Sequence, residues 1–196
     1  MTDPMIDLGP QTQVLARLAE GVSDEQLTDP TPCPELAVRH MLGHVLQLSV
    51  AFRDAGRKLL GPTTDTNPGE LVPDIGPGWR EELPKVLDEL AEAWRDPAAW
   101  TGMTRAGGFD LPGAVAGAVA IDELVIHGWD LARATGQPYT PDPTALQACH
   151  DFLLASKDDP SRGEIFGPVV PVPEDASLLD RAVGLSGRDP EWSQKP

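Results

Sequence analysis

The sequence predicts an all-α fold: a bundle of four substantial helices with an additional helix and a proline-rich C-terminal tail. Three observations lead to this fold class. Apolar residues recur at three- and four-residue steps along most of the chain, glycine and proline stand where these segments stop, and no convincing pair of strands is present. A chain of 196 residues with 40% hydrophobic content suits one core. We therefore expect a single domain over residues 1–196, whose tail from about residue 157 packs on the bundle.

The first two helices are predicted from apolar faces and from the glycines that follow them. The first helix ends at Gly21, and its apolar face consists of Leu8, Val14, Leu15 and Leu18. The second runs from about Leu36 to Leu60 and ends at Gly61-Pro62. Its apolar face consists of Met41, Val45, Leu48 and Phe52.

The remaining helices are separated by segments without periodicity. Residues 61–78 and 95–111 are predicted to be loops. Between them, the third helix runs from Trp79 to about Trp94, with Leu83, Val86, Leu87 and Leu90 directed inward. The fourth helix spans Pro112 to Thr135, and the fifth runs from Asp142-Pro143 to about Ser156. Prolines make residues 166–173 extended, and a short helix is expected near 175–183.

Charge and cysteine usage narrow the range of partners. The chain has 15 basic and 31 acidic residues. The resulting net charge of -16 repels phosphate backbones and anionic lipid. We therefore expect neither a nucleic-acid partner nor a membrane partner. The longest apolar stretch, Ala114 to Ile121, is too short to span a bilayer, and the N-terminus lacks the features of a signal peptide. Cys33 and Cys149 lack metal or disulfide spacing, so a reduced, cytoplasmic protein is expected.

Histidine spacing indicates a metal site. His40 and His44 are four residues apart on the second helix, and Glu123 and His127 are four apart on the fourth. Each pair therefore projects from one side of its helix. Metal sites in bundles are built from carboxylates and imidazoles that face inward from neighbouring helices. Two imidazoles and one carboxylate are a zinc set with an open position for water, and they also suit iron(II) or nickel.

Simpler explanations exist for each pair alone. An intrahelical hydrogen bond is enough to explain Glu123 and His127, and a satisfied core imidazole is enough to explain His44. Small residues precede Glu123 on the fourth helix, and they fit either a cleft or close helix packing: Gly113, Ala116, Gly117 and Ala120. The two pairs together favour a site between the helices.

Four blocks of sequence resemble an actinobacterial metal-binding family. Residues 31–44 resemble its TPCPxWTVRDLLxH block, and residues 122–136 resemble its ELLVHGWDLARATG block. Residues 166–173 and 187–192 resemble its closing segments. This family is related to the N-terminal domain of mycothiol-dependent maleylpyruvate isomerase, within the DinB-like superfamily.

The resemblance implies a four-helix bundle of up-down-down-up order with a divalent metal, usually zinc, in a central cleft. It places the metal ligands on His44, Glu123 and His127. His40 stands where the family usually has aspartate, so it is left out of the ligand set and expected to be exposed. Leu36-Ala37 replaces a Trp-Thr pair, which removes an N-cap hydroxyl worth about 1 kcal/mol. The isomerase is expected to carry a further C-terminal domain, so maleylpyruvate isomerisation is not carried over.

The resulting hypothesis is a mycothiol- or other thiol-dependent transferase or isomerase that acts on a small electrophile. A bound cation holds a coordinated thiol as the nucleophilic thiolate at neutral pH. Asp130, one turn after His127, is a candidate to orient that imidazole or to contact a ligand, although an exposed surface acid is the commoner case. No residue is assigned as catalytic.

Two alternatives stay open: a non-catalytic metal-dependent binding or sensor protein, and a hydrolase that uses metal-bound water. A fourth protein ligand, from His40 or Cys33, would close the site and favour a structural metal. The absence of a glycine-rich phosphate loop and of a GxSxG motif disfavours nucleotide and serine-nucleophile chemistry. A homodimer is neither indicated nor excluded.

Overall fold

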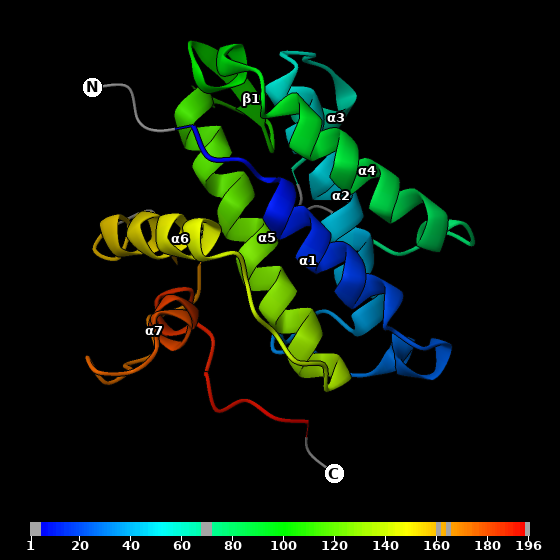
Figure 1. The fold of residues 1–196 in the computed structure, drawn as a ribbon, viewed down its shortest axis with the longest axis vertical. Coiled ribbons are helices and arrows are strands. Elements are labelled where there is room, and N and C mark those ends of the chain that lie inside the picture. Colours follow the sequence, from blue (N-terminus) through cyan, green and yellow to red (C-terminus); the bar gives the residue numbers. More distant parts are fainter. Residues whose placement is uncertain (1–4, 68–71, 160–161, 164–165, 195–196) are drawn as a thin grey trace.

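The computed structural model describes residues 5–67, 72–159, 162–163 and 166–194, and it confirms the predicted all-α fold class. Figure 1 shows how the helices are arranged. The described helices are α1 (Gly9–Glu20), α2 (Val38–Gly56), α3 (Pro62–Asp65), α4 (Trp79–Ala93), α5 (Gly113–Thr135), α6 (Pro143–Ala155) and α7 (Leu178–Leu185). Short 3-10 helices occupy Asp24–Thr28 and Pro97–Trp100. Two strands, β1 (Met103–Ala106) and β2 (Phe109–Pro112), complete the fold.

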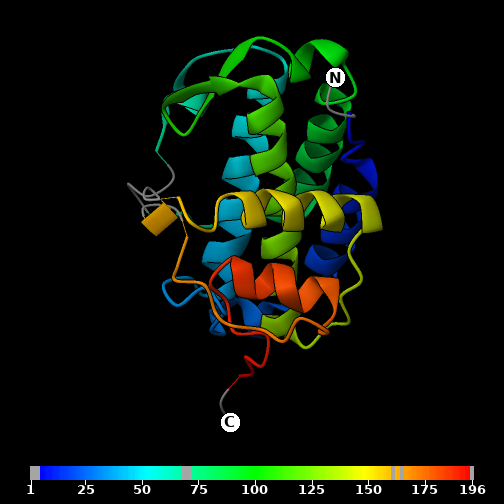
Figure 2. The ribbon, with the colours of Figure 1, turned by 90° about the vertical axis from the view of Figure 1, so that its left-hand side faces the viewer.

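Four helices form the bundle, and the last two lie against one side of it. Helix α2 packs on α4 and α5, and α1 packs on the same two partners from the other side. Helix α6 crosses α5, and α7 packs on α6 (Figure 2). The side chains of α2 and α5 therefore face each other directly, which is the arrangement that a site between them requires.

The core consists largely of the apolar faces that the periodicity predicts. Leu15 and Leu18 of α1, Met41 and Val45 of α2, and Leu87 of α4 are each at most 5% exposed. Burial of such side chains contributes about 1.5–3 kcal/mol each, before entropy costs. The amphipathic spacing of each helix therefore determines which face it presents to the bundle.

Helix α2 is shorter than predicted at both ends. It begins at Val38 and ends at Gly56, whereas the apolar pattern continues to Leu60. Lys58 adopts a left-handed conformation (φ 59°), which stops the helix. Its Nζ donates to the carbonyls of Ala99 (2.9 Å) and Thr101 (3.0 Å). A tertiary contact of the lysine thus accompanies the early end of the helix.

The predicted absence of strands is wrong, because β1 and β2 form an antiparallel hairpin within the segment expected to be a loop. Gly107 and Gly108 link the strands with φ of 60° and 83°. Two left-handed residues are the signature of a tight hairpin turn, and glycine adopts that conformation without strain. Thr104 in β1 donates its hydroxyl to the carbonyl of Ala55 (2.6 Å), which attaches the hairpin to α2.

Gly117 on α5 serves close packing rather than opening a cleft. A Cβ on Gly117 would lie 2.5 Å from a ring carbon of Trp100 and 2.9 Å from one of Trp94. These two indoles pack edge to face with centroids 5.1 Å apart. Trp94 donates to the carbonyl of Phe52 (2.9 Å), so its ring is fixed by a hydrogen bond as well as by packing. Of the two possibilities, a cleft or close helix packing, the structure contains close packing at Gly117.

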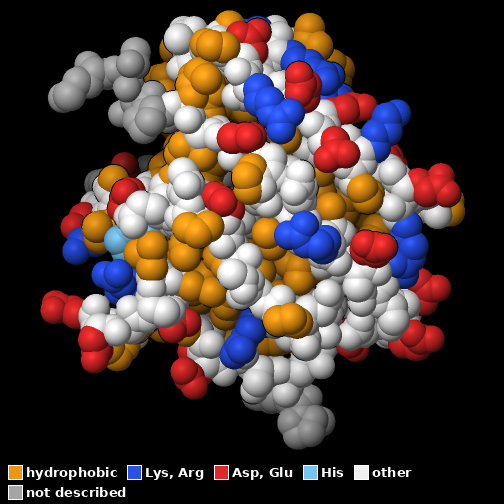
Figure 3. All heavy atoms as spheres, in the orientation of Figure 1, with side chains coloured by type: hydrophobic (Ala, Val, Ile, Leu, Met, Phe, Trp, Pro, Cys, Tyr) orange, Lys and Arg blue, Asp and Glu red, His pale blue; other side chains and the backbone are white. Residues whose placement is uncertain are grey.

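The C-terminal segment returns to the bundle. Residues 166–173 contain no helix or strand, as their prolines predict, and Val170 N donates to the carbonyl of Gly184 (3.0 Å). Arg133 of α5 donates to the carbonyls of Pro190 (3.1 Å) and Trp192 (2.7 Å). No helix in the described ranges is long and apolar enough to cross a membrane. Figure 3 shows the basic side chains of one face scattered among acidic ones.

The packing around Gly117 predicts a stability change. Gly117→Ala should lower the free energy of unfolding by about 1–3 kcal/mol, because the added methyl group overlaps rigid indole rings. Alanine's higher helix propensity, worth about 1 kcal/mol, acts in the opposite direction. Urea denaturation measures the difference. Val115→Ala, at a position 42% exposed on the same helix, is the control and should change stability by less than about 0.5 kcal/mol. A neutral or stabilising Gly117→Ala would contradict the packing argument.

Candidate metal centre

The interface between α2 and α5 brings together His44, Glu123 and His127. Their donor atoms all lie within 4.8 Å of one another. The Nε2 atom of His127 is 2.8 Å from Oε2 of Glu123, and the Nε2 atom of His44 is 3.7 Å from the same oxygen. The two imidazole centroids are 4.8 Å apart with an interplanar angle of 87°. Two helices thus direct three donors at one point.

The three side chains lie at a boundary between core and solvent. Relative exposure is 16% for the side chain of His44, 25% for that of Glu123 and 9% for that of His127. Met41, three residues before His44 on α2, and Val45, directly after it, are buried in the core. The bundle therefore fixes the helices while one side of the cluster stays accessible to a small molecule.

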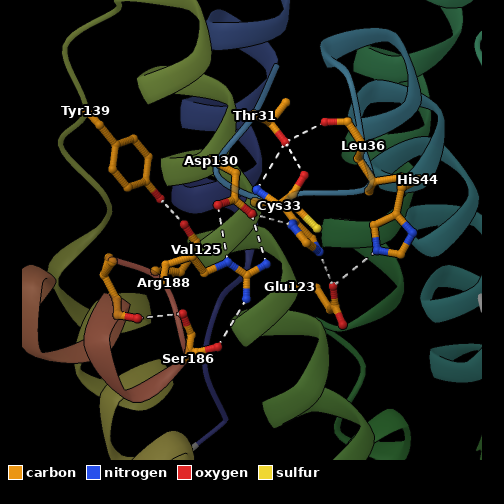
Figure 4. A network of polar contacts seen from close by, with 12 residues as sticks. Thr31, Cys33, Leu36, His44, Glu123, Val125, Asp130, Tyr139, Ser186 and Arg188 are labelled. Carbon is orange, nitrogen blue, oxygen red and sulfur yellow. Dashed lines mark hydrogen bonds and ion pairs between the residues drawn. The ribbon is translucent and has the colours of Figure 1, made fainter. Parts of the chain in front are cut away.

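Asp130 is completely buried and binds the other nitrogen of the His127 ring. Its Oδ2 atom lies 2.9 Å from His127 Nδ1 (Figure 4). An imidazole whose Nδ1 donates to a carboxylate presents Nε2 to its other partner, here Glu123. The expectation that Asp130 is an exposed surface acid is therefore wrong. The structure instead contains the alternative, in which Asp130 contacts the His127 imidazole.

Arg188 completes this network from the C-terminal segment. Its Nε and Nη2 atoms donate to the two carboxylate oxygens of Asp130 at 3.2 and 3.0 Å, and Nη1 donates to the carbonyl of Ser186 (3.3 Å). A buried carboxylate requires such a partner, because an unpaired charge in the interior is strongly destabilising. In the sequence, Arg188 belongs to a closing segment that resembles the family, and no role for it was predicted. The need of a buried Asp130 for a cationic partner was the only signal for Arg188, and it becomes visible once the burial of Asp130 is known.

The charges of the cluster stabilise one another. Burial alone would raise the pKa of Glu123, but the neighbouring imidazoles of His127 and His44 hold it well below its usual range. Burial alone would lower the pKa of His127, but Glu123 and Asp130 raise it to about 9. Burial opposes ionisation of Asp130 too, and Arg188 together with His127 lowers its pKa. The metal-free cluster therefore holds a proton on His127, between two carboxylates.

The donor set fits a divalent cation. Zinc takes imidazole nitrogen at about 2.0–2.1 Å and carboxylate oxygen at about 2.0–2.2 Å. Donors arranged around one such ion are separated by distances of the order found here, so small side-chain adjustments would suffice. The proton shared by His127 and Glu123 occupies the place that the cation would take. The same two-imidazole, one-carboxylate set accommodates nickel or iron(II).

The residues considered as a fourth ligand lie outside the cluster. Among the described residues, neither His40 nor Cys33 contributes a donor atom to it. His40 is half-buried rather than exposed, and its Nδ1 accepts the backbone N–H of Ala37 (3.4 Å) at the start of α2. An imidazole thus bonds the N-cap backbone of a helix whose N-cap, Ala37, has no hydroxyl. Burial raises the pKa of the Cys33 thiol, and the negative charge of Asp130 adds to this effect.

A second buried acid, Asp122, lies beside the cluster on α5. It is 3% exposed and accepts a hydrogen bond from the thiol of Cys149 on α6 at 3.3 Å. Burial, reinforced by the charge of Glu123, raises the pKa of Asp122 to about 7. This pair was not predicted from the sequence. The available signal for Asp122 was its position, directly before the candidate ligand Glu123 and after an apolar stretch.

A small pocket adjoins two of the three donors. Its volume is about 10 Å³, close to what one water molecule needs. Apart from Glu123 and His127, it is lined by Val45, Leu48, Ser49, Phe52, Leu90, Ala120 and Leu124. A larger groove of about 360 Å³ contacts none of the three donors and lies beside Arg57 and Arg95. The space next to the cluster is therefore narrow and mostly apolar.

Comparison with known proteins gives one family and two groups of relatives. The family model described as the mycothiol maleylpyruvate isomerase N-terminal domain matches residues 8–132. Two uncharacterized proteins of Mycobacterium tuberculosis, MT0763 and Rv0738, are each 25% identical to this chain over 191 residues. These residues cover 95% of this chain and 98% of each relative.

Two solved structures share the fold. A crystal structure of the mycothiol-dependent maleylpyruvate isomerase matches with a TM-score of 0.57 and 18% identity, covering 92% of this chain and 86% of that chain. A mutant of that enzyme matches with a TM-score of 0.56 and 17% identity, covering 95% and 92%. The predicted DinB-like fold class is thereby confirmed. Because the match extends over most of each isomerase chain, the expectation that the isomerase has a further domain absent from this chain is wrong.

The proton held by His127 predicts how metal affinity depends on pH. A cation must displace this proton, so affinity should rise by about tenfold per pH unit between pH 6.5 and 8.5, below the raised pKa of His127. Competition with a chromophoric chelator measures the affinity, and calorimetry in two buffers counts the protons released. Affinity that does not change with pH would contradict the assignment of His127 as a ligand that is protonated in the metal-free protein.

The pairing of Arg188 with Asp130 predicts a large stability loss on truncation. Arg188→Met should lower the free energy of unfolding by about 3 kcal/mol, since it leaves a buried carboxylate without its guanidinium. Arg133→Met is the matched control, because Arg133 joins the same segment to α5 but is exposed and contacts backbone carbonyls and the Trp129 ring, with no carboxylate partner among the described residues. It should cost less than about 1 kcal/mol. Equal losses in urea denaturation would show that the buried charge has no special importance.

Proposed function

Because this chain belongs to the mycothiol maleylpyruvate isomerase N-terminal domain family, we propose that it is a divalent-metal protein acting on a small-molecule thiol. Its function is that of a thiol-dependent transferase or isomerase whose second substrate is a small electrophile. The single observation that carries the proposal is the convergence of His44, Glu123 and His127 on one point. Mycothiol or a similar low-molecular-weight thiol is the cosubstrate.

His44, Glu123 and His127 are the residues that would hold the metal, with zinc the best fit and nickel or iron(II) the alternatives. A bound divalent cation supplies one kind of chemistry here: it lowers the pKa of a coordinated thiol, so that the nucleophilic thiolate exists at neutral pH. Since no fourth side chain among the described residues joins the cluster, the donor set leaves room for an exogenous ligand.

The surrounding residues orient the cluster. Asp130 fixes the tautomer of His127 by binding Nδ1, so that Nε2 is directed at the centre of the site. Arg188 neutralises Asp130 and prevents that carboxylate from competing as a ligand. Glu123 is 25% exposed, so the thiol and the electrophile approach from its side. The narrow apolar pocket beyond Glu123 and His127 excludes bulk water from the back of the cluster.

The identity of the electrophile is left to experiment. At 17–18% identity, the likeness to maleylpyruvate isomerase concerns the fold, so its substrate is not assigned to this chain. The net charge of -16 favours neutral or cationic electrophiles over polyanions at long range. A first screen therefore pairs one thiol with uncharged electrophiles.

The decisive measurement is elemental analysis of protein purified without a histidine tag, compared with a His44→Ala, His127→Ala double variant. The proposal expects about one equivalent of zinc, nickel or iron in the wild-type protein and none in the variant. The metal-loaded protein should then accelerate transfer of a thiol to an electrophile, and the metal-free protein should not.

Each other result has a definite meaning. No metal in the wild-type protein, even after reconstitution, would overturn the proposed site. Metal without thiol chemistry, but with hydrolysis of an ester or amide, would assign the site to metal-bound water. Metal with neither activity would favour a binding or sensor protein. His150→Ala is the control variant, because its imidazole pairs with Asp151 on α6 outside the cluster.

A further inference from the structure

Two polar side chains hold the turn of α5 formed by residues 123–127. Gln11 of α1 donates through Nε2 to the backbone carbonyl of Leu124 (3.1 Å), in a fully buried contact. The hydroxyl of Tyr139 donates to the carbonyl of Val125 (2.7 Å), as Figure 4 shows. Both carbonyls belong to residues that lie between the two proposed ligands of this helix.

Gln11 and Tyr139 form one connected unit. The Nε2 atom of Gln11 also lies 3.0 Å from the Tyr139 hydroxyl, and its Oε1 accepts the backbone N–H of Asp142 (2.9 Å). Asp142 in turn caps α6 by accepting from the backbone N–H of Ala145 (2.9 Å). Because Gln11 is 0% exposed and both ends of its amide are bonded, its side chain has a single available conformation.

A glycine permits this approach. A Cβ on Gly128 would lie 2.8 Å from the Tyr139 hydroxyl, too close for any side chain. Glycine destabilises a helix interior relative to alanine, so its presence directly after His127 calls for a reason. At about 100° per residue, Gly128 lies roughly 140° around the helix from Glu123 and roughly 100° from His127. Tyr139 therefore contacts the ligand-bearing turn from a side that differs from the one carrying the donors.

We propose that Gln11 and Tyr139 are positioning residues for the metal site, setting the rotation and axial placement of the turn that carries Glu123 and His127. This inference rests on the proposed function. A carbonyl fixed by a side chain from another element cannot shift along or around the helix, so the two donors keep their places relative to His44. Metal sites demand placement within about 0.5 Å. Loss of a partner that is hydrogen-bonded to a ligand side chain costs about 10–100-fold in metal affinity. Gln11 and Tyr139 act one step further out, on the backbone that carries the ligands, so the lower end of that range applies to them.

The test is cobalt(II) binding to the metal-free full-length protein, followed by chelator competition and by the visible absorption spectrum. Tyr139→Phe removes only the hydroxyl, and it should weaken cobalt affinity by about tenfold and change the absorption bands. Gly128→Ala should have the same effect, because it displaces the hydroxyl. Thr104→Val is the matched control, since it also deletes a buried hydroxyl bond to a helix carbonyl, that of Ala55, but on α2 and outside the network.

The outcomes separate positioning from ordinary stabilisation. Both hydroxyl deletions should lower the free energy of unfolding by a similar amount, yet only Tyr139→Phe should alter cobalt binding. If Tyr139→Phe binds cobalt with wild-type affinity and spectrum, or if Thr104→Val weakens binding equally, the positioning role is overturned while the metal site stands. If the wild-type protein binds no cobalt, the metal site and the positioning role fail together.

Discussion

The buried carboxylate of Asp130 is the constraint on which the candidate site depends. A negative charge with no exposed surface is tolerated only when it is paired and hydrogen-bonded. His127 meets it from the same helix and Arg188 meets it from the C-terminal segment. The need to pair the Asp130 carboxylate thus orients the His127 imidazole and holds the segment that carries Arg188 against α5. The pairing of Asp130 therefore affects both the donor cluster and the position of the C-terminal segment.

The same turn of α5 is contacted by elements on several sides. His44 approaches from α2, Tyr139 reaches the backbone from beyond the end of α5, and the thiol of Cys149 on α6 reaches Asp122. Each contact is polar and largely buried, in a region otherwise filled by aliphatic side chains. Buried polar networks rigidify a structure when every member has its partner. This is the property expected of a helix segment whose side chains must keep fixed places.

Much of the fold can be predicted from the sequence, because helical periodicity is a local property. The inward faces of α1, α2 and α4 follow from residue spacing alone, and so does the grouping of Glu123 with His127. The C-terminal end of α2 could not be predicted, because Lys58 stops the helix while bonded to a distant 3-10 helix. The hairpin was missed although Gly107-Gly108 is a turn signal, since four-residue strands carry little periodicity. The contact of Asp130 with His127 is local, so spacing could suggest it. Arg188 and Tyr139 act through contacts between distant segments, which spacing cannot reveal.

The position of Arg188 in the chain has a consequence for biosynthesis. Helix α5, with Asp130 on it, leaves the ribosome well before residue 188 is added. During that interval the carboxylate lacks its guanidinium, and burying it would be unfavourable. The nascent bundle must therefore keep this part of α5 hydrated or loosely packed until residue 188 has been made. Any event that cuts the chain before residue 188 leaves the buried carboxylate of Asp130 without its guanidinium.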